Sequence, residues 1–182
     1  MTEHHLAQAL ESAELVHDRT VLEAAVARMG GQLTRTLDGE RALFLTVMHG
    51  GLIFAGQLAL SIGSDLQFDY VHATRYRGGT QGGQLQWRRR PEAPMRDRSV
   101  ILADDILDEG NTLTALRDAC LAEGARRVLI AVLCEKRHDR RVPGLVADFV
   151  GVQVPDRYVF GYGMDYHERG RNLPGIYALR EG

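Results

Sequence analysis

Three acidic residues and a glycine follow one apolar run at a spacing that suits phosphate and sugar binding. Asp104 and Asp105 come directly after the predicted buried strand at 100–103, and Asp108 and Gly110 follow within five residues. A predicted helix then begins, and free N–H groups at a helix N-terminus bind anions such as phosphate. Adjacent carboxylates suit ribose hydroxyls or a hard cation carried by a phosphorylated ligand. Helix capping, or a metal site of a receiver-type or phosphatase-type domain, would use such acids too.

Apolar runs alternate with helical patterns along the chain, which predicts an α/β domain with a mainly parallel central sheet. Strands are expected at 42–48, 68–73, 100–103, 127–133, 149–154 and 158–162, and helices at 52–60 and 112–123. Nearer the N-terminus, the apolar spacing predicts a helix over 6–16 and a second one that begins after Asp18 and ends at Gly30-Gly31. Ligands bind beyond the carboxyl ends of parallel strands, so we expect the chemistry there.

Length, composition and charge limit the possible classes of protein. The 182 residues, 45% hydrophobic and 25% charged, predict a single globular domain over 1–182. A net charge of −2 and a pI near 6.4 count against a general binder of nucleic acids or membrane surfaces. Cys120 and Cys134 form neither a disulfide framework nor a zinc cluster, and free thiols suit a reducing cytosol. With no signal-peptide or transmembrane pattern visible, we expect a cytoplasmic protein.

The segment 100–113 resembles the phosphoribosyl-pyrophosphate (PRPP) signature of type I phosphoribosyltransferases, in which two acids and two apolar residues precede Asp-Thr/Ser-Gly-x-Thr. The resemblance extends from about residue 40 to 180 and is closest to the hypoxanthine-guanine phosphoribosyltransferases. It implies a twisted parallel sheet flanked by helices, with a small hood over the base site from residues 1–40 and 150–182. It also implies Mg²⁺ as cofactor, PRPP and a 6-oxopurine as substrates, no nucleic acid or membrane partner, and a homodimer or homotetramer.

The resemblance assigns roles within the signature. Asp104 and Asp105 would hold the ribose hydroxyls and, partly through ligand and water, Mg²⁺. Asp108 would interact with N7 of the purine as general base or acid, and it is the expected catalytic residue. The residues implied to bind the 5′-phosphate are Asp108, Glu109, Gly110, Asn111 and Thr112. Glu109 replaces the usual threonine or serine, so we expect its carboxylate to point outward and its backbone N–H to remain the donor.

Two glycine-rich segments resemble the pyrophosphate loop and the lid of the same family. Met48-His49-Gly50-Gly51 is similar to Leu-Lys-Gly-Gly, whose backbone amides face the diphosphate and whose cis peptide would fall at Met48–His49. Taken alone, the glycines could simply form a strand-to-helix turn. Residues 74–94 indicate a functional loop or a hairpin. The resemblance implies a mobile active-site loop there, in which Tyr76 matches the usual Ser-Tyr pair and Arg75 does not.

Residues nearer the C-terminus are implied to bind the purine and the pyrophosphate. Lys136 would donate to the 6-oxo group, which favours hypoxanthine or guanine over adenine because an ammonium group can only donate. Tyr158 would stack on the base and Val159 would read its edge through the backbone. Asp165 would bind a second Mg²⁺ close to the base, and Arg171 would point at pyrophosphate. Without the resemblance, Lys136 would be a solvent-facing lysine at the exit of a strand, and Tyr158 and Val159 would be ordinary strand residues.

Three functions stay open at this point. The first is transfer of the 5-phosphoribosyl group from PRPP to N9 of hypoxanthine or guanine, giving IMP or GMP and pyrophosphate. The second is a regulator of the same fold that binds nucleotide and nucleic acid, which would need a basic face. The third is an enzyme for xanthine or another base, because Lys136 does not separate 6-oxopurines from each other. The histidines at 4, 5, 17 and 138 show no metal-ligand spacing and are expected at the surface.

Overall fold

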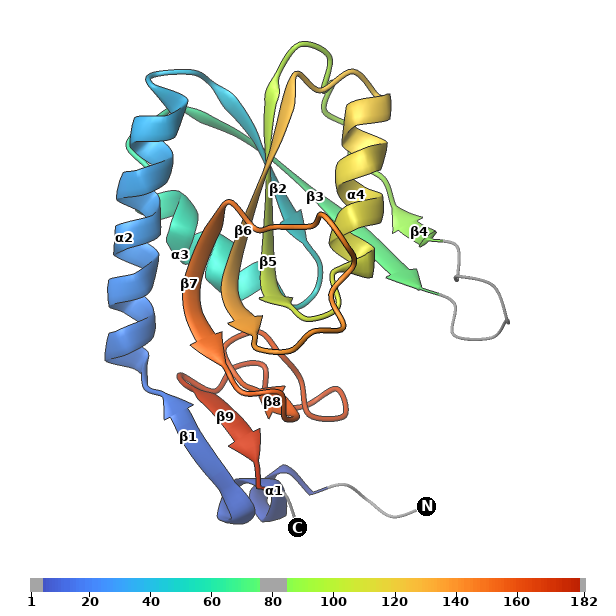
Figure 1. Cartoon of the computed structure of the whole chain (residues 1–182). Coiled ribbons are helices and arrows are strands. Elements are labelled where there is room, and N and C mark those ends of the chain that lie inside the picture. Colours follow the sequence, from blue (N-terminus) through green and yellow to red (C-terminus); the bar gives the residue numbers. More distant parts are fainter. Residues whose placement is uncertain (1–4, 76–84, 181–182) are drawn as a thin grey trace.

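A computed structural model describes residues 5–75 and 85–180 of the chain as four helices and nine strands in these ranges (Figure 1). The helices are α1 (Leu6–Ser12), α2 (Arg19–Leu37), α3 (Leu52–Leu60) and α4 (Asn111–Ala122). The strands are β1 (Ala13–His17), β2 (Ala42–Val47), β3 (Leu66–Arg75), β4 (Leu85–Arg89), β5 (Ser99–Leu107), β6 (Arg127–Lys136), β7 (Phe149–Val154), β8 (Val159–Phe160) and β9 (Ile176–Leu179). They form a six-stranded and a three-stranded sheet.

The six-stranded sheet has the order β4-β3-β2-β5-β6-β7 and confirms the predicted α/β class. Its pairings are parallel except at the edge, where β4 runs antiparallel to β3. Helices α2 and α3 cover one face and α4 covers the other (Figure 1). Strands covered on both faces are apolar on both faces, which explains the continuous apolar runs in β2 and in the first half of β5.

The N-terminal prediction is correct for the helix over residues 6–12 and for the cap and start of the second helix, and it is wrong at the ends of both helices. Asp18 caps α2, accepting a hydrogen bond from the N–H of Val21 at 2.9 Å. Residues 13–17, however, form a strand, because they pair with β9 and this pairing overrides the local helical spacing. The predicted stop at Gly30-Gly31 is also wrong, since α2 continues to Leu37. A Cβ atom on Gly30 would overlap with the backbone of Ser61, so this glycine permits close contact between α2 and the end of α3.

The three-stranded sheet has the order β1-β9-β8 and joins the two ends of the chain, as expected for the hood. All of its pairings are antiparallel. Helix α2 and strand β7 overlap the ranges 1–40 and 150–182 expected for the hood, but they pack in the main α/β body. Figure 1 shows the small sheet below the carboxyl ends of β6 and β7.

The segment 74–94 forms a hairpin in its described parts, which is the second of the two alternatives drawn from the sequence. Strand β3 continues to Arg75, whose partner in register on β4 is Leu85. Tyr76 lies outside the described residues, and the mobility of the segment stays a prediction. Among the described residues, no helix has the length and apolar character needed to cross a membrane.

Candidate active site

The loop that follows β2 meets the neighbouring strand β5 at one edge of the central sheet. Strand β2 leads into residues 48–51, and its neighbour β5 carries Asp105. A Cβ atom on Gly50 would overlap with the Asp105 carboxylate, so residue 50 must be glycine for this contact. The peptide between Met48 and His49 is cis, at the position implied by the resemblance. The expected pyrophosphate loop and the expected ribose-binding acids therefore lie in contact.

Asp104 and Asp105 lie within strand β5 rather than after it. The sequence predicted a strand that ends at residue 103, but pairing with β6 extends β5 to Leu107. Burial, and after it the adjacent Asp105 carboxylate, raises the pKa of Asp104 well above its usual value. Burial also raises the pKa of Asp105, against the lowering effects of its hydrogen bond with Asp104 and of the Arg171 charge. The two acids thus form a partly buried pair whose negative charge is incompletely balanced.

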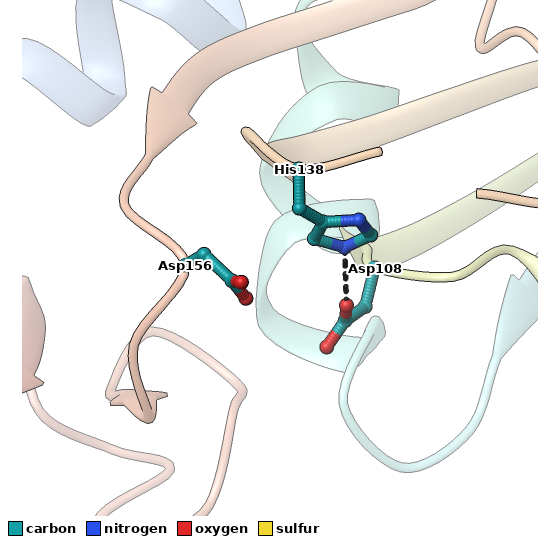
Figure 2. Close-up of side chains that lie close together, drawn as sticks. All are labelled: Asp108, His138 and Asp156. Atoms are coloured by element: carbon teal, nitrogen blue, oxygen red, sulfur yellow. Dashed lines mark hydrogen bonds and ion pairs between the residues drawn. The ribbon is translucent and has the colours of Figure 1, made fainter. Parts of the chain in front are cut away.

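Asp108 lies beyond the end of β5 and accepts hydrogen bonds on both carboxylate oxygens. Lys136 Nζ donates to Oδ2 at 2.8 Å. His138 Nε2 lies 2.7 Å from Oδ1, as Figure 2 shows. Partial burial acts to raise the pKa of Asp108, but the hydrogen bonds from Lys136 and His138 outweigh it and hold this pKa below its usual value. Asp108 is therefore an ionised carboxylate at neutral pH, next to the lysine expected to bind the base.

Helix α4 begins directly after this acid, with Gly110 as its N-cap in the left-handed region at φ 84°. The first hydrogen bond of the helix runs from the N–H of Thr114 to the carbonyl of Gly110 at 2.9 Å, so earlier N–H groups have no acceptor within the helix. Glu109 is exposed, as expected, and its Oε2 accepts from the side-chain amide of Asn111 at 2.9 Å. The first turn of α4, which includes Thr112, thus presents donors suited to a phosphate.

The residues expected near the base and pyrophosphate converge from the C-terminal part of the chain. Arg171 pairs with one of them, its Nη2 lying 2.8 Å from Oδ1 of Asp165, and its Nη1 donates to the carbonyl of Gly163 at 2.8 Å. The hydroxyl of Tyr158 donates to the carbonyl of Asp165 at 3.1 Å, and the ring itself stays half-exposed. Val159 is buried in β8. The Tyr158 ring also lies edge-on to Tyr166 at 5.8 Å and parallel to His167 at 6.4 Å, and its exposed part can contact a planar ligand.

One residue at the site was not predicted from the sequence. His138 was expected at the surface, but its side chain is only 3% exposed and contacts Asp108. The loop after β6 brings it back to the end of β5, and no sequence spacing signals this contact. His49, which replaces the family's lysine, lies with its ring centroid 4.5 Å from that of His72. Tyr76 lies outside the described residues, and for Arg75 only the backbone position is described.

Comparison with known proteins agrees with this geometry. The phosphoribosyl transferase domain model matches residues 12–168. The chain is 33% identical over 168 residues to a hypoxanthine-guanine phosphoribosyltransferase of Streptococcus pneumoniae, covering 92% of each chain. It is 32% identical over 182 residues to the enzyme of that name from Streptococcus mutans, covering 100% of this chain and 97% of the relative.

Solved structures show the same likeness in three dimensions. A hypoxanthine phosphoribosyltransferase from Staphylococcus aureus superposes with a TM-score of 0.89 at 27% identity, covering 98% of this chain and 97% of that one. A hypoxanthine-guanine phosphoribosyltransferase from Bacillus anthracis superposes with a TM-score of 0.86 at 29% identity, covering 92% and 98%. With the sheet-edge loops described above, these matches show that the chain belongs to the hypoxanthine-guanine phosphoribosyltransferase family.

Proposed function

We propose that this chain is a purine salvage enzyme that transfers the 5-phosphoribosyl group from PRPP to N9 of hypoxanthine or guanine. The products would be IMP or GMP and pyrophosphate. The observation that carries the proposal is the contact of Asp108 with Lys136, a carboxylate and an ammonium group 2.8 Å apart beside the α4 N-terminus. A 6-oxopurine presents an acceptor at O6 and a titratable nitrogen at N7 next to it, which matches this pair. The names of the full-length relatives support the same class of base.

PRPP would bind along the sheet edge. The 5′-phosphate would accept hydrogen bonds from the N–H groups of residues 108–112 at the start of α4. Asp104 and Asp105 would accept hydrogen bonds from the ribose hydroxyls. The pyrophosphate group would face the backbone amides of Gly50 and Gly51, near His49, and the Arg171 guanidinium. This placement uses the contact of Gly50 with Asp105, which brings the two loops together.

The donor set also fits Mg²⁺, a hard cation that prefers carboxylate oxygens and water. Asp104 and Asp105, with Asp165 nearer the base, would hold it partly through PRPP and water. The Asp104 and Asp105 carboxylates are adjacent and repel each other, so a cation bound there would balance their charge. Mg²⁺ bound with PRPP would neutralise diphosphate charge and so improve the leaving group.

The chain's own residues would position the base and move one proton. Lys136 would donate to O6, the Tyr158 ring would stack on the base, and the backbone of Val159 would contact the base edge under the hood. As N9 bonds to C1′ and the bond to pyrophosphate breaks, the ionised Asp108 would accept the proton leaving N7. The paired acids below the ribose would stabilise the positive charge that develops on the ring. The hairpin at 74–94 would exclude water when it closes.

A direct assay tests this proposal. PRPP-dependent nucleotide synthesis is measured with adenine, hypoxanthine, guanine and xanthine in the presence of Mg²⁺. We expect turnover with hypoxanthine and guanine and none above background with adenine. Turnover with xanthine alone would replace the proposed bases. An absence of turnover with all four, together with a salt-dependent gel shift on nucleic acid, would favour the regulator instead.

The proposal extends to a cytoplasmic location and to assembly of several copies of the chain. Two buried free thiols, Cys120 and Cys134, suit a reducing cytoplasm. Assembly as a homodimer or homotetramer is supported by apolar side chains that are more than half exposed, Leu52 and Leu60 of α3 and Phe68 of β3. Light scattering after gel filtration measures the mass in solution, and a monomer at micromolar concentration would contradict the expected assembly.

A further inference from the structure

The two oxygens of the Asp108 carboxylate are held by two different residues from the end of β6 and the loop after it. Lys136 Nζ lies 2.8 Å from Oδ2, and His138 Nε2 lies 2.7 Å from Oδ1. The side chain of His138 is 3% exposed, against 41% for Asp108. Figure 2 shows the imidazole facing the acid edge-on through this nitrogen. A buried imidazole thus contacts the carboxylate that our proposed function makes the general base.

The second ring nitrogen fixes which proton His138 carries. The backbone N–H of Arg140 donates to Nδ1 at 3.1 Å. A nitrogen that accepts a hydrogen bond carries no proton, so the ring is the neutral tautomer with its proton on Nε2. His138 is therefore a donor to Oδ1 of Asp108. Fixing one nitrogen through the hydrogen bond of the other is how proteins orient functional imidazoles.

Arg140 is itself held from another part of the chain. Its guanidinium forms two hydrogen bonds with Asp156, at 2.7 Å and 2.8 Å. Asp156 lies in the turn between β7 and β8, just before Tyr158. A planar two-bond contact of this kind restricts orientation as well as distance. The backbone that donates to His138 is therefore anchored from the turn that leads to the expected base-stacking ring.

The same three side chains could be considered as metal ligands, since oxygen or nitrogen atoms of Asp108, His138 and Asp156 lie within 4.8 Å of one another. The charges oppose this interpretation. Both oxygens of Asp156 accept from Arg140, and Oδ2 of Asp108 accepts from Lys136. Each carboxylate already has a cationic partner, so we assign the cluster to hydrogen bonding.

Resting on the proposed function, we propose that His138 is a positioning residue that holds Oδ1 of Asp108 while Oδ2 changes partner from Lys136 to the purine. When a 6-oxopurine binds, Lys136 donates to O6 and leaves Oδ2, and the adjacent N7 takes its place. Without a second donor the carboxylate would be free to rotate with the departing ammonium group. The hydrogen bond from His138 keeps Oδ2 directed at N7, so the acid is oriented before the proton moves.

Two variants of similar side-chain length separate this role from packing. His138→Gln keeps an N–H donor, whereas His138→Met fills the space without one. We expect His138→Met to lower kcat by about ten-fold or more, with KM for PRPP unchanged. His138→Gln should restore kcat to within about three-fold of the wild type. Thermal unfolding of both variants, with midpoints near that of the wild type, completes the comparison.

An unchanged kcat in His138→Met, or an equal loss in both variants, would overturn the proposal. Should His138→Met fail to fold, Asp156→Ala is the second variant, because both oxygens of this partly exposed turn residue accept from Arg140. It should lower kcat by about three-fold with KM for PRPP unchanged, and wild-type kcat would overturn the proposal. Wild-type protein that is inactive with every base contradicts the proposed function, whereas an active wild type with active His138→Met contradicts only the role of His138.

Discussion

Gly50, in the loop after β2, and Asp105, in strand β5, are in direct contact although they lie far apart in the sequence. The contact arises because β2 and β5 are parallel neighbours, so their carboxyl ends meet at the same sheet edge. Gly51 is held equally closely, since a Cβ atom there would lie 2.6 Å from the carbonyl oxygen of Val47 and 2.7 Å from that of Ala103. The loop of the proposed pyrophosphate site is therefore packed directly against the strand that carries the proposed ribose site.

The first prediction follows from Gly51. Both atoms that a Cβ would meet are backbone atoms of central strands, so Gly51→Ala must displace the loop rather than a flexible side chain. We expect kcat/KM for PRPP to fall by about 10²-fold, as misplacement by about 1 Å can cost that much. Steady-state kinetics at saturating base measure the effect.

Gly31 in α2 provides the matched control, because a Cβ there would meet only the end of the flexible Arg35 side chain, at 3.6 Å. Gly31→Ala should keep wild-type kcat/KM and raise helix stability by roughly 0.5–1 kcal/mol. Equal kinetics in the two variants would show that close contact at residue 51 does not position the loop.

The second prediction concerns proton transfer by Asp108. Asp108→Asn keeps the shape of the side chain and an acceptor oxygen for His138 but cannot take a proton from N7. Turnover should fall by about 10²-fold or more, while PRPP binding measured by calorimetry stays within about three-fold. Asp139→Asn, an exposed neighbour of His138, should leave both quantities unchanged. Wild-type turnover in Asp108→Asn would remove this residue from the acid–base chemistry.

The third prediction separates the ring of Tyr158 from its hydroxyl. Tyr158→Phe loses only the hydrogen bond to the carbonyl of Asp165, whereas Tyr158→Ala loses the stacking surface. Stacking of an aromatic ring on a base contributes about 1–3 kcal/mol, so KM for the base should rise about ten-fold or more in Tyr158→Ala. In Tyr158→Phe it should stay within about three-fold, and KM for PRPP should not change in either variant. The same KM for the base in all three proteins would argue against stacking.

Elements with apolar residues on both faces could be predicted closely from the sequence. Strand β2 was expected at 42–48 and covers Ala42–Val47, and α3 has the expected limits Leu52–Leu60. Residues 13–17 were assigned wrongly because their strand depends on β9, more than 150 residues away. The spacing of apolar residues within a short segment contains no information about a strand partner so distant in the sequence. The same holds for Gly30, whose contact with Ser61 depends on how α2 packs on α3.

The residues of the site also differ in whether the local sequence identifies them. Asp104, Asp105 and Asp108 could be identified because strand, acids and helix start follow each other directly in the sequence. The contact between Asp108 and His138 could not, because it joins the ends of two parallel strands through a loop of irregular structure. The length of β5 was also underestimated, since pairing with β6 continues through Asp104 to Leu107. Tertiary pairing outweighs the weak strand propensity of aspartate there.

The last prediction concerns stability far from the site, at Glu40 between α2 and β2. Its carboxylate accepts from the N–H of buried Ser99 at 3.1 Å and from its hydroxyl at 2.9 Å, and it pairs with Arg127 at 3.1 Å. Partial burial acts to raise the pKa of Glu40, but the hydrogen bonds from Ser99 and the charges of Arg126 and Arg127 outweigh it and lower this pKa. Ionised Glu40 therefore stabilises the folded state.

Because the folded pKa is the lower one, this stabilisation is complete above the unfolded value of about 4.3 and is lost as the pH falls through the folded value. Glu40→Gln should lower the free energy of unfolding by about 1–2 kcal/mol at pH 7, with a smaller difference below about pH 4. Urea unfolding across this pH range measures the difference, and Glu11→Gln on the exposed surface of α1 serves as the control. A difference of the same size at pH 3 and pH 7 would mean that Glu40 acts through its shape rather than through its charge.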